Sequence, residues 1–171
     1  MTKQNDPKKR LFVDDSLCLG CKTCELSCSV ERSSLSKTLA GAVCEDVLPR
    51  PRLYVQWQQE KSMPIQCRHC ADAPCLEICS TGAMRRDEES GCVYIQAKQC
   101  ISCWMCIMVC PYGVIAPAIE KQAADKCDQC FQMLQPYCLA SCPTGALQLL
   151  SANEIEQHLQ EKRREKLPYS R

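Results

Sequence analysis

The sequence predicts an α+β fold in which short strands and single helical turns connect cysteine-rich loops. Two compositional facts and one pattern lead to this prediction. Cysteine fills 18 of the 171 positions, and few residues are aromatic, namely 2 Trp, 5 Tyr and 2 Phe. The cysteines also recur in a motif that is written four times. A core so poor in large side chains needs other support, such as disulfides or bound metal.

Each copy of the motif is a quartet of cysteines that begins with C-x2-C and ends with C-x3-C. The middle gap holds two residues in the first and third quartets, four in the second and seven in the fourth. Because a C-x3-C pair shares one face of a helix, each quartet is predicted to end on a single helical turn. The quartets are, in order, Cys18, Cys21, Cys24 and Cys28; Cys67, Cys70, Cys75 and Cys79; Cys100, Cys103, Cys106 and Cys110; Cys127, Cys130, Cys138 and Cys142.

The segments between and after the quartets predict the remaining elements. Short strands are expected at 10–13, 52–56, 93–96 and 146–149, with a hairpin turn at 86–91 before the third of them. Residues 29–51 read as a long connection with a small, polar middle. Residues 151–166 read as a charged, solvated helix, which Ser151 and Glu154 begin in capping-box spacing.

Disulfides are a weak explanation for so many cysteines, because they require an oxidising compartment and an export signal. The first ten residues, MTKQNDPKKR, are polar and basic, and no apolar segment follows them. No stretch approaches the roughly 18 consecutive apolar residues of a membrane span. The prediction is a cytoplasmic protein without a membrane span, either free or peripheral to a membrane-bound complex. The net charge of +1 gives no indication of a nucleic-acid partner.

The spacing of the quartets indicates [4Fe–4S] clusters. Such a cluster needs one thiolate on each of four irons, and the run C-x2-C-x2-C-x3-C-P is typical of two-cluster ferredoxins, where the fourth cysteine binds the other cluster. The sequence therefore predicts four [4Fe–4S] clusters, with the sixteen quartet cysteines as iron ligands. A cluster with four thiolates carries about −2 charge. Basic residues near the quartets are candidates to offset it: Arg50, Arg52, Arg68, Arg85, Arg86, Lys98 and Lys126.

Zinc is the alternative that the pattern leaves open. Four-cysteine zinc sites pair two C-x2-C knuckles that usually lie about 15–20 residues apart. Here each whole quartet closes within 11 to 16 residues, and a tetrahedral zinc has no use for the extra third cysteine of the loop. Under this alternative the chain is a zinc-binding interaction module that uses its basic terminal helix.

A few chemically active residues lie outside the predicted ligand set. Cys44 and Cys92 are expected to be ordinary buried or surface thiols, because every quartet is already complete. His69 is expected to tune a cluster as a neighbour, Trp104 to shield one from water, and His158 to be solvated. With 2 His in the chain and no Gly-rich phosphate loop, the sequence predicts no catalytic residues.

Several segments resemble a known family. They are CLGCKTCELSCSVE at 18–31, PRPR at 49–52, QCRHC at 66–70, APC at 73–75 and CWMC at 103–106. From about residue 11 to 150 the chain resembles the four-cluster ferredoxin-like subunits of the dimethyl-sulfoxide-reductase iron–sulfur subunit superfamily. It is most similar to the ferredoxin-like protein that accompanies carbon monoxide dehydrogenase.

This resemblance implies an architecture and a ligand pairing. The architecture is two pseudo-symmetric ferredoxin-like (βαβ-type) halves in one compact unit, 1–171: one half from 10–50 plus 120–150, the other from 51–119, and a helical tail at 151–171. The implied ligand sets cross between quartets: Cys18, Cys21, Cys24 and Cys142; Cys127, Cys130, Cys138 and Cys28; Cys67, Cys70, Cys75 and Cys110; Cys100, Cys103, Cys106 and Cys79.

The implied function is non-catalytic electron transfer. The expected partners are carbon monoxide dehydrogenase and a second redox enzyme, either a hydrogenase or a flavin-containing NAD(P) or ferredoxin oxidoreductase. The alternative is the electron-transfer subunit of a formate dehydrogenase and hydrogenase complex. In both cases the redox chemistry belongs to the clusters and to the partner enzymes.

Overall fold

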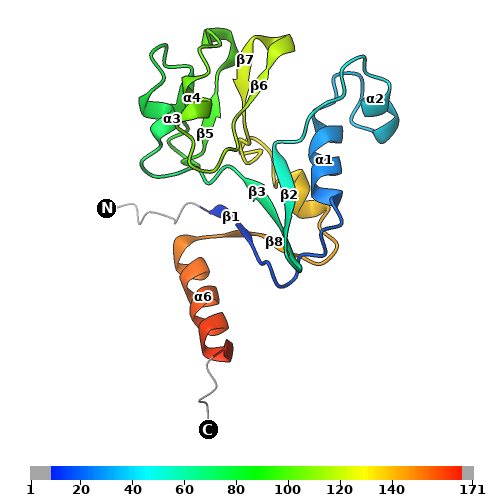
Figure 1. Cartoon of the computed structure of the whole chain (residues 1–171), viewed down its shortest axis with the longest axis vertical. Coiled ribbons are helices and arrows are strands. Elements are labelled where there is room, and N and C mark those ends of the chain that lie inside the picture. Colours follow the sequence, from blue (N-terminus) through cyan, green and yellow to red (C-terminus); the bar gives the residue numbers. More distant parts are fainter. Residues whose placement is uncertain (1–8, 167–171) are drawn as a thin grey trace.

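The computed structural model describes residues 9–166, and in that range the strands form four two-stranded antiparallel sheets (Figure 1). The first sheet joins the two ends of the chain, and the other three are hairpins. The pairs are β1 (Arg10–Val13) with β8 (Leu147–Leu150), β2 (Leu53–Gln58) with β3 (Lys61–Gln66), β4 (Met84–Arg86) with β5 (Val93–Ile95), and β6 (Ala116–Ala118) with β7 (Ala123–Asp125).

Four short helices carry the ends of the quartets, as the C-x3-C spacing predicts. The first, α1 (Thr23–Glu31), contains both Cys24 and Cys28. The other three, α3 (Pro74–Glu77), α4 (Met105–Met108) and α5 (Tyr137–Ala140), are four-residue turns. Each of these turns contains the third cysteine of its quartet, and the fourth cysteine follows two residues after the turn.

All four expected strands are present: β1 has the predicted bounds, and the ends of β2, β5 and β8 differ from the predicted ones by at most two residues. The 86–91 turn joins β4 to β5 as predicted. Strands β3 and β6 were not expected. Each contains a proline, Pro64 or Pro117, which cannot donate a hydrogen bond to a neighbouring strand. Both prolines are tolerated because every strand of a two-stranded sheet has a free edge.

The apolar core consists of two separate clusters. The first contains Leu11, Cys24, Leu53, Val55, Cys138 and Leu147, and the second contains Ala73, Met84, Val93, Ile115 and Ala124. Figure 1 shows β1, β8, β2, β3 and α1 around the first cluster, and α3, α4, β5, β6 and β7 around the second. The packing therefore divides the two halves at positions different from those expected. Leu53 and Val55 pack with the first half, and Ala124 packs with the second.

The long connection after the first quartet is partly helical, which the sequence did not predict. Helix α1 runs on to Glu31, and α2 (Leu39–Val43) begins after Thr38, whose hydroxyl accepts a hydrogen bond from the Gly41 amide. Figure 1 shows α2 projecting beyond α1, away from the sheets.

The C-terminal helix, α6 (Ala152–Lys166), begins as predicted. The Ser151 amide donates to Glu154 Oε2 (2.7 Å), and the Glu154 amide donates to Ser151 Oγ (3.3 Å), which completes the capping box. Residues 167–171 of the expected tail lie outside the described range, as do residues 1–8. The described part of the chain has no helix with the length and apolar character that crossing a membrane demands.

The prediction that His158 is merely solvated was wrong. Its Nε2 lies 2.9 Å from Asp14 Oδ2, and its ring meets Phe12 edge-on with 5.2 Å between ring centres. Lys162 donates to the other oxygen of Asp14. Since His158 and Lys162 are one helical turn apart, they form a single face of α6 that holds the helix against the end of β1.

Candidate iron–sulfur centres

The sixteen quartet cysteines are divided into the four sets that the family resemblance implies, called centres A to D, and the structure brings thiols of different quartets close together within these sets. Three thiols of each group are consecutive in one quartet, and the fourth comes from another quartet. Centre A is Cys18, Cys21, Cys24 and Cys142; centre B is Cys28, Cys127, Cys130 and Cys138; centre C is Cys67, Cys70, Cys75 and Cys110; centre D is Cys79, Cys100, Cys103 and Cys106.

Centre B is the most enclosed group. Cys127 and Cys138 are buried, and a small cavity between α1, β2 and the fourth quartet is lined by all four of its cysteines. Burial, together with the neighbouring thiols of Cys28 and Cys130, raises the pKa of Cys138 to about 12. Burial likewise raises the pKa of Cys127 well above its usual value.

Centre A brings together the two ends of the chain. Burial, with smaller contributions from the charges of Glu25 and the nearby Cys142, raises the pKa of Cys24 to about 11. The charge of Cys142 also acts on Cys21, which is solvent-exposed. Cys18 accepts a hydrogen bond from the Ser62 hydroxyl (3.5 Å between Oγ and Sγ), so β3 closes this side of the centre.

Centres C and D show the same crossing of quartets. Burial raises the pKa of Cys75, and the charges of Cys67, Cys110 and Cys70 add to it. Burial also raises the pKa of Cys106, to about 11, with Cys100 and Cys103 as the nearest added charges. The four cysteines of centre D line one narrow cavity together with Trp104.

Backbone amides point at the sulfur atoms, and the local sequence explains why. The His69 amide donates to Cys67 Sγ (3.4 Å) and the Gln129 amide to Cys127 Sγ (3.3 Å). His69 and Gln129 hold the same place in their quartets and both have a positive φ, 47° and 60°. This left-handed turn bends each C-x2-C loop around a centre and aims its N–H groups inward.

The fourth cysteine of a quartet is held in a similar way. After Cys79 the chain reads STGAM and after Cys142 it reads PTGAL, with a positive φ at the glycine of each segment, Gly82 and Gly145. The Met84 amide donates to Cys79 Sγ (3.3 Å), and the threonine hydroxyl two residues after each cysteine lies 3.8 Å from its sulfur. These donors stabilise a thiolate rather than a thiol.

The donor set fits iron–sulfur clusters. All eighteen cysteines are free thiols, and several have raised pKa values, so grouped thiolates at these positions need a cationic partner such as iron. Among residues 9–166, no three His, Cys, Asp or Glu side chains converge closely enough to hold a single metal ion.

Lys126 supplies a second test of fit. It is 2% exposed, and its ammonium donates to Cys67 Sγ (3.4 Å), to the Cys127 carbonyl (2.8 Å) and to the Val93 carbonyl. A buried charge is strongly destabilising unless an opposite charge lies beside it. A cluster with thiolate ligands supplies that opposite charge at the Cys67 sulfur.

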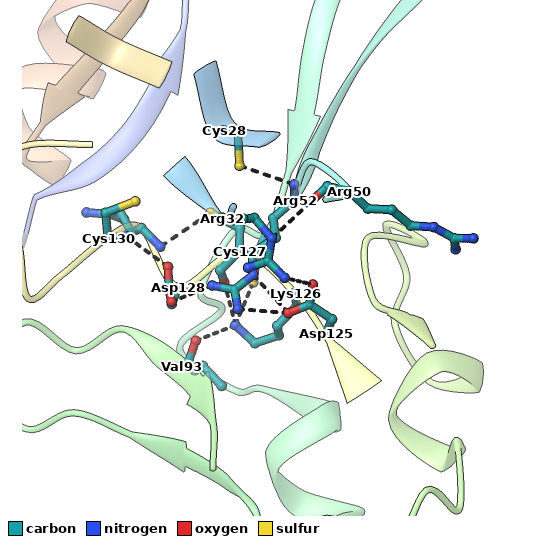
Figure 2. A network of polar contacts seen from close by, with 12 residues as sticks. Cys28, Arg32, Arg50, Arg52, Val93, Asp125, Lys126, Cys127, Asp128 and Cys130 are labelled. Carbon is teal, nitrogen blue, oxygen red and sulfur yellow. Dashed lines mark hydrogen bonds and ion pairs between the residues drawn. The ribbon is translucent and has the colours of Figure 1, made fainter. Parts of the chain in front are cut away.

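A network of ion pairs braces centre B from the side of α1 and β2 (Figure 2). The Arg52 amide donates to Cys28 Sγ (3.3 Å), and the Arg52 guanidinium pairs with Asp125 (2.8 Å) and Asp128 (2.5 Å). Arg32 pairs with the second oxygen of Asp125 (2.5 Å). Burial alone would raise the pKa of Asp128, but the Arg52 charge and hydrogen bonds lower it.

The remaining expectations have mixed outcomes. His69 is 3% exposed, and its Nδ1 accepts a hydrogen bond from the Val93 amide (2.9 Å), so its proton lies on Nε2. Burial, followed by the Lys126 charge, lowers the pKa of His69 to about 3 and keeps the ring neutral. Cys92 is fully buried and Cys44 is exposed, as expected of ordinary thiols.

Of the seven basic residues named from the sequence, Lys126 donates to a quartet sulfur through its side chain and Arg52 through its amide. The sequence offered no reason to prefer these two over the other five basic residues, and it did not identify Asp125 and Asp128 as the ion-pair partners of Arg52. The only local signal was the position of Lys126 directly before Cys127.

Comparisons with known proteins agree with this geometry. A family model described as a 4Fe–4S dicluster domain matches residues 58–152. The electron transport protein HydN of Escherichia coli is 37% identical over 170 residues, which cover 90% of this chain and 94% of that protein. An iron–sulfur protein of Rhodospirillum rubrum is 32% identical over 90% of this chain and 87% of its own.

A subunit of the anaerobic dimethyl sulfoxide reductase of Escherichia coli is 32% identical over 160 residues, 84% of this chain and 74% of its own length. The comparisons and the grouped thiols lead to the same conclusion. This protein belongs to the 4Fe–4S dicluster family and is an iron–sulfur electron-transfer protein rather than an enzyme.

Proposed function

We propose that this chain relays electrons through four [4Fe–4S] clusters, one at each of centres A, B, C and D, with the sixteen quartet cysteines as ligands. The observation that carries the proposal is the gathering of thiols from different quartets, such as Cys28 beside Cys130 and Cys138. A bound [4Fe–4S] cluster accepts and releases one electron, and the protein supplies its ligands, its hydrogen bonds and its exclusion of water.

Contacts between neighbouring sets of cysteines support a relay in which each cluster lies next to the following one. Cys24 of centre A packs with Cys138 of centre B in the first core cluster. Lys126 touches Cys67 of centre C and the carbonyl of Cys127 of centre B. Cys75 of centre C acts electrostatically on Cys106 of centre D. This order, A to B to C to D, supports electron passage along the whole molecule.

The two outer centres are the proposed points of electron entry and exit. The quartet cysteines that are exposed, Cys21 and Cys103, belong to centres A and D. Large apolar side chains are exposed beside them in the sequence: Leu19 (65%) near Cys21, and Ile101 (65%) near Cys103. A redox partner that docks on either surface approaches a centre without displacing a structural element.

The proposed partners are carbon monoxide dehydrogenase and a second redox enzyme, either a hydrogenase or a flavin-containing NAD(P) or ferredoxin oxidoreductase. This choice rests on the resemblance of the cysteine segments. A formate dehydrogenase complex is the alternative source of electrons. The relative named as part of a dimethyl sulfoxide reductase supports the wider statement that the partner is a redox enzyme.

Strictly anaerobic affinity purification from the native host, with mass spectrometry of the co-eluting proteins, tests the partner. Recovery of carbon monoxide dehydrogenase is the expected result, and the other co-eluting redox enzyme identifies where the electrons go. Recovery of a formate dehydrogenase alone would move the relay to that complex. A colourless, zinc-containing protein without acid-labile sulfide would overturn the relay itself.

A further inference from the structure

Lys126 is a buried cation at the junction between centres B and C. It follows β7 directly and precedes Cys127, the first cysteine of centre B that the fourth quartet supplies. From there its side chain crosses to the second half of the molecule, where it reaches Cys67 Sγ at 3.4 Å and the Val93 carbonyl at the start of β5 (Figure 2).

Three hydrogen-bond acceptors surround the Lys126 nitrogen. Its three partners are two carbonyl oxygens, of Val93 and Cys127, and the sulfur of Cys67. As an iron ligand that sulfur is a thiolate, so all three partners accept hydrogen bonds. A neutral amine has only two N–H bonds, whereas an ammonium has three and no acceptor. The geometry therefore matches a charged group with every proton directed at a protein atom.

Lys126 has no carboxylate of its own within the described part of the chain. The aspartates on either side of it in sequence, Asp125 and Asp128, bind Arg52, and Asp125 also binds Arg32. The ion pairs found among residues 9–166 include none from Lys126 to an acidic side chain. Its charge is thus directed at the cysteine sulfur of centre C, in a water-excluded position where screening is weak.

We propose that the Lys126 ammonium is a fixed cation shared by the two inner clusters, which raises their reduction potentials above those that the same ligands would give alone. The inference rests on the proposed function, because it requires clusters at centres B and C. Reduction adds negative charge to a cluster, and a nearby buried cation stabilises the reduced form more than the oxidised form. Centre C feels the larger effect, since the ammonium donates directly to Cys67.

The Lys126 charge acts unequally on the four proposed clusters. The outer centres contain the exposed thiols Cys21 and Cys103 and lie away from Lys126, so the ammonium acts on them less. The ammonium therefore stabilises an electron on centres B and C more than an electron on centre A or D.

Potentiometric titration followed by electron paramagnetic resonance tests the proposal on Lys126→Met and Lys126→Gln. Both variants remove the charge, and Gln keeps a hydrogen-bond donor. In each variant, one or both midpoint potentials of the inner clusters are expected to fall by about 59 mV or more, which is a tenfold change in the equilibrium constant of a one-electron couple. The other midpoint potentials are expected to keep their wild-type values. Lys126→Arg keeps the charge and restores the potentials toward the wild-type values.

Lys98→Met is the matched control. It removes the same charge two residues before Cys100, but Lys98 is exposed, so solvent screens it and the potentials stay at the wild-type values. If Lys126→Met and Lys126→Gln bind four clusters with unchanged reduction potentials, the proposal is overturned. The contacts of Lys126 then serve only to join the two halves of the fold. If the wild-type protein itself holds no clusters, the proposed function fails first.

A spectroscopic measurement on the wild-type protein tests the proposal even if the variants do not fold. With lysine labelled by ¹⁵N, pulsed electron paramagnetic resonance of the reduced protein detects a lysine nitrogen coupled to a cluster through the hydrogen bond to Cys67. Absence of any such coupling, with the clusters reduced, overturns the proposal without the need for a variant.

Discussion

Arg52 connects three segments of the chain through its own backbone and side chain. Its amide donates to Cys28 Sγ at the end of the first quartet, and its guanidinium pairs with Asp125 at the end of β7 and with Asp128 in the fourth quartet. The side chain is 24% exposed, so these pairs are partly shielded from water and are stronger than exposed pairs. The contacts position the loop that supplies three thiols of centre B.

Arg52→Met is expected to destabilise the folded protein by about 1–3 kcal/mol, because it leaves Asp125 and Asp128 without the Arg52 charge while the backbone contact to Cys28 remains. Thermal denaturation under anaerobic conditions measures the change. Arg50→Met is the matched control, since Arg50 contributes a backbone carbonyl to the network and its side chain points away from it (Figure 2). Equal stabilities of the two variants would contradict this account.

Asp14 gives the docking of α6 a defined pH dependence. Burial alone would raise the pKa of Asp14, but hydrogen bonds from Lys162, Ser16 and His158 outweigh it and hold the pKa well below its usual range. A carboxylate with a depressed pKa adds stability above its unfolded pKa of about 3.9, and that stability is lost as the pH falls below this value.

The protection factors of the α6 amides, which correct hydrogen exchange for its intrinsic pH dependence, are therefore expected to be constant near neutral pH and to fall progressively below about pH 4. Asp14→Asn is expected to accelerate exchange of the α6 amides already at neutral pH. This comparison avoids acid, which would also damage the proposed clusters. Asp15→Asn is the control, because Asp15 is 42% exposed and pairs with Lys61 and more distantly with Lys162. Slow exchange in Asp14→Asn would show that α6 is held by something else.

At the residue scale, the sequence spacing defines the quartets, and the structure places thiols of different quartets close together, such as Cys28 beside Cys130 and Cys138. Lys126, Asp14 and Arg52 could not be given their roles in this way, because their partners lie far away in sequence. A local pattern carries no information about which distant segment a side chain meets. The ligand roles of the sixteen cysteines remain predictions.

The capping box stabilises the first turn of α6. Ser151 is 4% exposed and exchanges two hydrogen bonds with Glu154. Ser151→Ala is expected to lower the stability of the helix by about 0.5–2 kcal/mol, because the Glu154 amide then lacks its acceptor. The helical signal in circular dichroism at rising temperature measures the loss.

Glu154→Gln is the control for that measurement, since Gln also accepts a hydrogen bond from the Ser151 amide in a capping box. A Ser151→Ala protein as stable as Glu154→Gln would contradict the assigned cap.

At the element scale, the sequence predicted elements whose local signals agree with their structure. The capping box of α6 and the apolar pattern of β1 and β8 are of this kind. Strands β3 and β6 were missed because Pro64 and Pro117 argue against strands, and β7 because its alanines have a low strand propensity. Pairing with a neighbouring segment outweighed those local preferences.

The stability of the whole fold is expected to depend on the cysteine centres, in the way that the stability of other domains depends on an apolar core. Both core clusters contain cysteines among their buried or partly buried members, for example Cys24 and Cys138 in the first and Cys75 and Cys106 in the second. Without iron, these thiols and the Lys126 charge would be buried together with no compensating partner.

Removal of the clusters with a chelator and an oxidant is accordingly expected to unfold the chain in residues 9–166. Loss of the fixed near-ultraviolet circular dichroism signal and faster backbone hydrogen exchange are the readouts. Mock treatment of the same protein without chelator is the control. An apoprotein that keeps slow exchange in both core clusters would contradict a structural role for the centres.

The central claim is that one polypeptide holds four [4Fe–4S] clusters, and the most direct test is chemical analysis joined to Mössbauer spectroscopy of anaerobically purified protein. Four clusters of four irons predict about sixteen iron and sixteen acid-labile sulfide atoms per polypeptide, with all iron in cubane-type signals. Half that content in a fully folded protein would contradict the assignment at two of the four centres. Zinc without sulfide would contradict it at all of them.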